Sequence, residues 1–267
     1  MLSVGPSAAL VEGFDSFIRL PASAIMARSG TDPAPAILES GPSARPEELI
    51  AEVNRRYDMA RGRGSISALL AVASAVADKP MEDVNAAYDN SKGRGRTSAM
   101  LVAASALSGK SISEVNTAYD NSKGMGSISA TLVLGAALGG VPIRDVNAAY
   151  SNAKAMGKAA AMLALGSALS GKPISELNAA YANAKGVSRV SALLAVASAL
   201  SGRPIADVNA AYDNARGMGH ASALLTLGAM AQGADMEGRK RLAAVIIAQM
   251  VFAAEDDDDT STTTPLR

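Results

Sequence analysis

Apolar and polar positions recur along the middle of the chain with a fixed period of 31 residues. Six copies of the motif Asn-x-x-Tyr follow one another without insertion or deletion, at Asn54/Tyr57, Asn85/Tyr88, Asn116/Tyr119, Asn147/Tyr150, Asn178/Tyr181 and Asn209/Tyr212. A constant period of this length predicts a repeat architecture in which each unit is one supersecondary structure. We number repeat positions from the residue before the Asn, so that position 1 is Val53, Val84, Val115, Val146, Leu177 and Val208.

The segment 173–202 shows the local structure that one unit predicts. Pro173 suits the first turn of a helix, where its missing N–H is not needed, and apolar residues up to Tyr181 follow at helical spacing. Gly186 indicates the end of this first helix. A second helix over about 188–201 is apolar nearly all round, which predicts that it is buried between neighbouring units. Ala and Gly at positions 16, 21 and 23 allow neighbouring helices to approach closely.

These patterns predict an all-α fold, a right-handed αα-superhelical solenoid of six 31-residue two-helix repeats with terminal caps. We expect the repeats to occupy residues 46–233, after a partly disordered N-terminal extension over 1–45. Residues 234–254 are expected to form a C-terminal capping helix. The acidic, Thr-rich residues 255–267 hold little that could form a core, so we expect a disordered tail.

The repeat resembles known helical-repeat classes. The stretch NAAYANAKGVSRVSALLAVASALSGRP, residues 178–204, is similar to a pentatricopeptide unit in its order of Asn, Lys-Gly, Ala, aliphatic residues, Gly and Pro. Two-helix units with small and aromatic residues also resemble the tetratricopeptide class, whose units are longer, at about 34 residues. The resemblance covers the repeat block and implies stacked helical hairpins.

Composition argues against an enzyme. The chain has no Cys, which excludes a disulfide scaffold, a thiolate metal site and a Cys nucleophile, and it has one histidine, His220. Four of the six turns contain Gly-x-Gly, but these turns join helix to helix, unlike the strand-to-helix turn of a dinucleotide site. We therefore predict no catalytic residue, no metal site and no cofactor.

No apolar stretch reaches the roughly 18 residues that a membrane span needs, and the N-terminal residues lack the pattern of a secretory signal. We expect a cytoplasmic protein that does not contact membranes. The sequence leaves the oligomeric state open.

Positive charge is concentrated in the repeats, although the chain as a whole is neutral. Residues 53–232 carry 18 Lys+Arg and 11 Asp+Glu, between flanks with net charges of −4 and −3. Eleven of these 18 cations lie at positions 9, 11 and 13, in the turn between the two helices. With the histidine they form our candidate partner-binding surface, the basic turn edge, which comprises Arg61, Arg63, Lys92, Arg94, Arg96, Lys123, Lys154, Lys158, Lys185, Arg189, Arg216 and His220.

Three columns of this pattern have different interpretations. Position 9 is always basic and position 31 is acidic in five units, which favours simple complementation of the dipole of the first helix. Cations at position 13 (Arg96, Lys158, Arg189) fall at the start of the second helix, where they oppose the dipole. A helix N-terminus with a basic side chain is a natural anion site, so a basic edge could track phosphates or an acidic protein segment. Alternatively, these side chains extend into solvent.

The Asn and Tyr columns also allow two interpretations. The Asn side chains can hydrogen-bond a neighbouring turn while the Tyr rings fill the space between units. Alternatively, both line the concave surface and contact a ligand, with Tyr stacking on bases. We favour packing, because unvarying residues specify packing more readily than recognition.

The function that fits best is a protein adaptor or scaffold that binds a macromolecular partner along its repeat surface. A neutral overall charge does not favour tight, sequence-independent nucleic-acid binding, but nucleic-acid binding through the basic turn edge is the main alternative. A third alternative is a secreted bacterial effector, since a Ser-, Pro- and Ala-rich segment precedes the repeats.

Overall fold

The computed structural model describes residues 54–215, 219–230 and 235–261, and over these residues the chain is helical without any strand. Longer and shorter helices alternate along the repeats. The longer ones are α3 (Ser65–Ala77), α5 (Arg96–Ser108), α7 (Gly126–Gly139), α9 (Gly157–Ser170), α11 (Arg189–Ser201) and α13 (His220–Met230). The shorter ones are α4 (Met81–Asp89), α6 (Ile112–Asp120), α8 (Ile143–Ser151), α10 (Ile174–Asn183) and α12 (Ile205–Asn214). The chain then forms α14 (Met236–Ser261).

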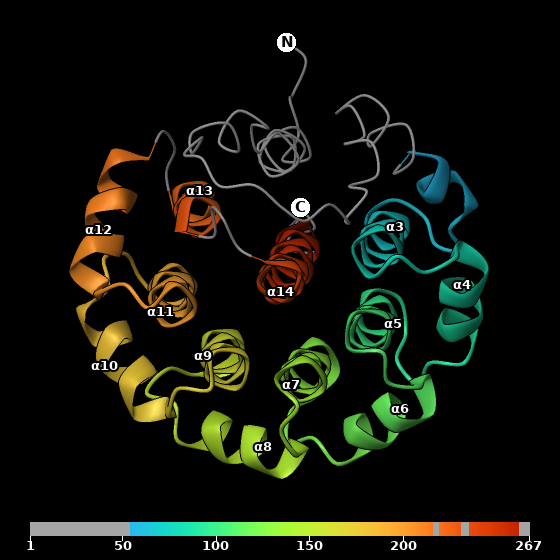
Figure 1. Cartoon of the computed structure of the whole chain (residues 1–267), viewed down its shortest axis with the longest axis horizontal. Coiled ribbons are helices and arrows are strands. Elements are labelled where there is room, and N and C mark those ends of the chain that lie inside the picture. Colours follow the sequence, from blue (N-terminus) through green and yellow to red (C-terminus); the bar gives the residue numbers. More distant parts are fainter. Residues whose placement is uncertain (1–53, 216–218, 231–234, 262–267) are drawn as a thin grey trace, which may run out of the picture.

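The helices are arranged in two curved layers (Figure 1). The shorter helices form the outer arc, the longer helices form the inner arc, and α14 lies at the centre of the curve. Each inner helix packs against the next inner helix along the chain and against its flanking outer helices. The prediction of an all-α fold with helices packed in neighbouring pairs is confirmed.

Burial follows the pattern of apolar residues. The inner helices are surrounded by protein, and in α5 every residue from Ser98 to Leu107 is buried. The outer helices are amphipathic and bury one face, on which the position 1 side chains Val84, Val115, Val146, Leu177 and Val208 are all buried. A helix that is apolar all round has to be enclosed, whereas a helix with a polar face can lie on the outside. The layer of each helix is thus set by its own sequence.

Small residues allow the inner helices to approach closely. A Cβ added to Gly166 would lie 2.6 Å from Cγ2 of Val196, and one on Gly139 would lie 2.4 Å from the carbonyl oxygen of Ala168. Gly135 is also tightly packed, with Leu165 at 3.3 Å from the added Cβ. The predicted close approach at position 21 is therefore confirmed for Gly135 and Gly166.

Position 12 begins each inner helix with a backbone that favours glycine. Five units have Gly there, with φ between +54° and +56°, at Gly64, Gly95, Gly126, Gly157 and Gly219. The sixth has Ser188, with φ 50° and ψ −113°. Side chains with a Cβ rarely adopt this conformation, which costs on the order of 1–3 kcal/mol. Ser188 therefore stores strain that the other units avoid.

The position of α14 differs from the expected terminal cap over 234–254. The helix contacts α3, α5, α7, α9 and α13, and so it lies inside the arc rather than at its end. The physical reason is burial, because the inner arc is apolar and α14 carries many apolar residues that become buried there, including Leu242, Val245 and Phe252. An end cap would cover only the last hairpin.

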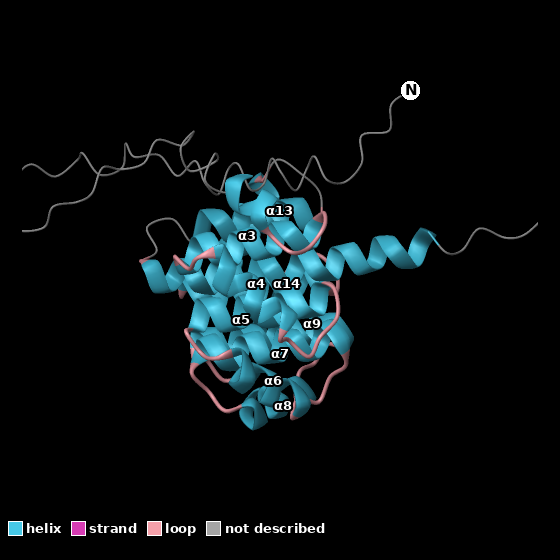
Figure 2. Ribbon diagram, turned by 90° about the vertical axis from the view of Figure 1, so that its right-hand side faces the viewer, coloured by secondary structure: helices cyan, strands magenta, loops and turns pink. Residues whose placement is uncertain are grey.

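Part of the segment expected to be a disordered tail is helical instead. The backbone of α14 continues as helix through residues 255–261, and its last turns project beyond the other helices (Figure 2). Of the remaining expectations, the extension over 1–45, the start of the repeats at 46–53 and the end of the tail at 262–267 lie outside the described residues.

Replacing Ser188 by Gly is expected to raise the free energy of unfolding by about 1 kcal/mol, because strain is relieved at the expense of some extra freedom in the unfolded chain. The matched control is Gly157→Ser, where the added Cβ meets nothing within 4 Å and only the φ of +56° opposes it. This variant should lose about 1–2 kcal/mol. Urea denaturation of both variants measures the effect, and changes of the same sign would contradict the strain at position 12.

Candidate functional site

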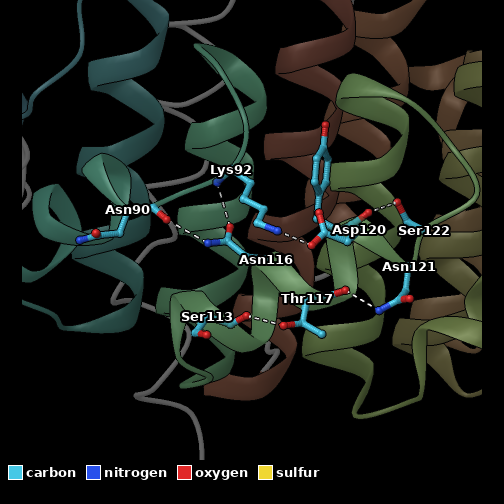
Figure 3. A network of polar contacts seen from close by, with 9 residues as sticks. Asn90, Lys92, Ser113, Asn116, Thr117, Asp120, Asn121 and Ser122 are labelled. Carbon is cyan, nitrogen blue, oxygen red and sulfur yellow. Dashed lines mark hydrogen bonds and ion pairs between the residues drawn. The ribbon is translucent and has the colours of Figure 1, made fainter.

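The Asn column connects consecutive units through one repeated arrangement. Oδ1 of Asn147 accepts a hydrogen bond from the backbone N–H of Lys123 at 2.9 Å, and Nδ2 donates to the carbonyl oxygen of Asn121 at 2.9 Å. Figure 3 shows the same pair of bonds around Asn116. Asn85, Asn178 and Asn209 repeat them at 2.8–2.9 Å. Each of these side chains therefore holds the turn of the preceding unit at positions 7 and 9.

Both polar atoms of these Asn side chains are occupied, which supports the packing interpretation. The rings of Tyr88, Tyr119, Tyr150, Tyr181 and Tyr212 are partly buried and pack against the hydrophobic core. Tyr57 is more exposed, and the turn that Asn54 would hold lies outside the described residues. A side chain whose donor and acceptor are both used within the protein offers little to a ligand.

Four of the cations at position 9 form bonds with the next unit instead of complementing a helix dipole. Lys92 pairs with Asp120 (Figure 3) and Lys185 with Asp213. In the same way Arg61 lies 3.6 Å from Asp89, and Nζ of Lys123 donates to Oγ of Ser151 at 3.2 Å. The outer helices end before position 9, so none of them has a basic residue in its last turn. For Lys154 the residue 28 positions later is Ala182, which has no polar side chain to bond.

The acidic residues at position 31 do lie where the dipole interpretation places them, in the first turn of the outer helices. Glu114 also completes a capping box with Ser111. The hydrogen bond from the side chain of Ser111, assisted by its backbone N–H, lowers the pKa of Glu114. Acids at these places stabilise the helices.

The residues at position 13 lie at the start of the inner helices, and two of them, Ser127 and Lys158, contact the C-terminal part of α14. Nζ of Lys158 is 3.1 Å from Oε2 of Glu255, 3.3 Å from the carbonyl oxygen of Phe252 and 5.7 Å from the centre of its ring. The hydroxyl of Ser127 donates to the same carboxylate oxygen at 2.8 Å. The positive charge that opposes the dipole of α9 is therefore compensated by an acid from α14.

The other position 13 residues are also only partly exposed. Nε of Arg96 donates to Oγ of Ser65 at 3.2 Å, and Arg189 and His220 begin α11 and α13. The side chains at position 13 that can carry a positive charge are Arg96, Lys158, Arg189 and His220, and all four are partly buried. The alternative prediction, that these side chains extend into solvent, does not hold for them. Together they follow the edge of the inner arc at which the inner helices begin.

Position 11 forms a third row, and this row is exposed. Arg63 and Arg94 precede Met125, Met156 and Val187, whose exposed fractions are 87%, 89% and 79%. Met125 and Met156 directly precede α7 and α9, and Val187 lies two residues before α11. These three helices are neighbours in the inner arc. We call Met125, Met156 and Val187 the apolar turn row. Arg216 at position 9 and Met218 at position 11 of the last unit lie outside the described residues.

The structure thus divides the basic turn edge into three rows with different surroundings. Position 9 pairs with the next unit, position 13 borders α14, and position 11 faces solvent. The sequence analysis missed the partners Asp89, Asp120 and Asp213 at position 6, although their fixed separation of 28 residues from position 9 was a detectable signal. It also missed Glu255 and Phe252, for which no periodic signal exists.

No protein-family model and no curated protein sequence matches the chain. Among the described residues, none of the helices combines the length and the hydropathy required to cross a bilayer. The same residues contain no group of three or more His, Asp or Glu side chains arranged to hold a metal ion.

Replacing Asn178 by Ala is expected to lower the free energy of unfolding by about 2 kcal/mol, because two hydrogen bonds are lost at a side chain that is only 7% exposed. Asn183→Ala on the same helix is the control, since its exposed amide bonds only to the carbonyl of Ala179 one turn earlier. That change should stay within about 0.5 kcal/mol. Equal losses in urea denaturation would show that the Asn column does not hold the units together.

Proposed function

We propose that the chain is a non-enzymatic, right-handed αα-solenoid of six 31-residue repeats that acts as a protein adaptor or scaffold. The observation that carries the proposal is the apolar turn row, in which three large apolar side chains are exposed at the same position of three consecutive turns. Soluble proteins seldom keep such side chains together in water unless a partner covers them.

The local backbone gives no reason for these residues. Met125 and Met156 are the N-cap residues of α7 and α9, and neither contributes a side-chain capping bond. Polar residues such as Ser, Asp and Asn are preferred at an N-cap. Methionine is flexible and polarisable, which suits an adaptable protein-binding surface. The row therefore costs local stability and supports a role in recognition.

The neighbouring charges indicate the chemistry of the partner. Arg63 and Arg94 occupy the same column as the apolar turn row, in the two preceding units, and both are exposed. A protein segment with apolar side chains followed by carboxylates would match this order of apolar and basic positions. Charge complementarity of this kind contributes mainly to specificity and to the rate of association.

Nucleic-acid binding has less support from these contacts. Three position 9 cations are paired with carboxylates of the next unit, and Lys158 is paired with Glu255. Phosphates would have to compete with these carboxylates for the same cations. The exposed Arg63 and Arg94 keep the alternative open to experiment.

Changing Met125, Met156 and Val187 together to Ser is expected to reduce partner capture at least tenfold while leaving the helical content unchanged, because truncation of buried anchors costs about 2 kcal/mol or more. Pull-down of tagged full-length chain with quantitative mass spectrometry measures this. Met236→Ser, an equivalent change at another exposed Met (59%) outside the row, should retain the partner. If the triple variant retains the same proteins as wild type, the apolar turn row is not the binding surface.

Fluorescence anisotropy with labelled single-stranded RNA and duplex DNA distinguishes the alternative. We expect weak binding near 50 mM salt that is lost in Arg63→Ser/Arg94→Ser and falls only shallowly towards 200 mM, because few cations are available to phosphates. A steep loss of a tight complex, of about 10³-fold or more over this range, would instead establish nucleic acid as the ligand.

A further inference from the structure

Within the described part of the chain, the inner arc surrounds the helix α14 (Figure 1). We infer that the concave face is a docking groove for a largely apolar helix with a carboxylate towards its C-terminal end, and that α14 is a built-in occupant which such a helix displaces. This site is separate from the apolar turn row and does not depend on the function proposed for that row.

The apolar part of the groove is defined by what α14 buries in it. Side chains along the length of the helix are buried, among them Leu242, Val245, Ile247, Val251 and Phe252. The helix α14 contacts α3, α5, α7, α9 and α13, so the contact extends across several units. A helix laid into a concave apolar surface in this way is a common mode of peptide recognition.

The edge of the groove specifies the polarity of the occupant. The inner helices begin at the edge where Lys158 and Ser127 bind Glu255. Helix N-termini carry partial positive charge, and Lys158 adds a full charge at a place where it opposes the dipole of α9. These features favour a helix whose C-terminal turn arrives at this edge with a carboxylate. The groove therefore recognises direction and charge as well as apolar surface.

One residue makes α14 a poorer occupant than the groove allows. Gln249 is only 2% exposed, and neither Nε2 nor Oε1 has a hydrogen-bond partner among the described residues. Burying an amide without partners is unfavourable, so an apolar residue of similar size at this place would dock more tightly, by roughly tenfold or more. Gln249 thus weakens the docking of α14, and a competing helix needs less affinity for the groove to displace it.

Displacement still has to overcome the advantage of a tethered occupant. A helix attached to the same chain competes at an effective concentration in the millimolar range. A partner helix with an apolar residue in place of Gln249 and an acidic residue in place of Glu255 would bind the groove more tightly than α14 does. Its higher affinity would offset part of the advantage that the tether gives to α14. A helix that fits the groove better than α14 can therefore take its place without a change in the repeats.

The test uses full-length chains and a defined probe, a fluorescent peptide of residues 236–261 carrying Gln249→Leu. The chain with Phe252→Ser/Glu255→Gln, whose own α14 is weakened without adding a charge, is expected to bind the probe at least tenfold more tightly than wild type. Adding Lys158→Glu to that chain should reduce binding at least tenfold. A probe that also carries Glu255→Lys should recover binding to the Lys158→Glu chain, because the charges are then exchanged.

Two results would overturn the proposal. One is that the weakened chain keeps its helical circular dichroism but does not bind the probe. The same conclusion follows if it binds the probe equally well whichever charges stand at 158 and 255. The other is loss of the helical signal in the weakened chain, which would show that α14 is an integral part of the core. Hydrogen exchange in the milder variant Glu255→Lys, with faster exchange confined to the C-terminal part of α14, is the expected companion result, and faster exchange throughout the repeats would count against the groove.

Discussion

The arrangement of this protein depends on the pair of hydrogen bonds that each Asn side chain makes to the turn of the preceding unit. A turn between two short helices leaves a backbone N–H and a carbonyl without helical partners. One amide group supplies both missing partners at once, as at Asn147 with the backbones of Lys123 and Asn121. Because the same two bonds recur from unit to unit, each hairpin is held in nearly the same orientation to the one before. A constant step of this kind produces the regular curve of the two layers.

That constant orientation has an electrostatic consequence. The inner helices all begin at one edge of the arc, so their positive dipole ends lie together, and α14 brings its C-terminal part to this edge. Lys158 and Glu255 meet there because the dipoles of the inner helices and of α14 run in opposite directions. Glu255 is thus matched to a basic side chain at the edge where the inner helices begin. Cations that look unfavourable within one helix become favourable once the central helix is in place.

The three rows of the turn edge show how one short segment serves separate purposes. At position 9 the side chains strengthen the contact between units, as Lys92 does with Asp120. At position 13 they border the central helix. At position 11 they have no structural partner that would explain Met125 or Met156, which are almost fully exposed. Selection for binding can act on this last row without disturbing the other two, since it touches neither the Asn bonds nor the core.

The sequence alone predicted the helices, their order and the burial of the second helix of each unit, because these depend on periodicity. For the Asn side chains it favoured packing over ligand contact, and the hydrogen bonds to the preceding turn support packing. Gly166 and Val84 could be assigned to packing from a single unit. The central position of α14 was decided only by the tertiary structure. The inner helices follow a curve that no local pattern displays, and only this curve creates a concave surface long enough to receive a helix. The meeting of Lys158 with Glu255, 97 residues later in the sequence, follows from that curvature alone.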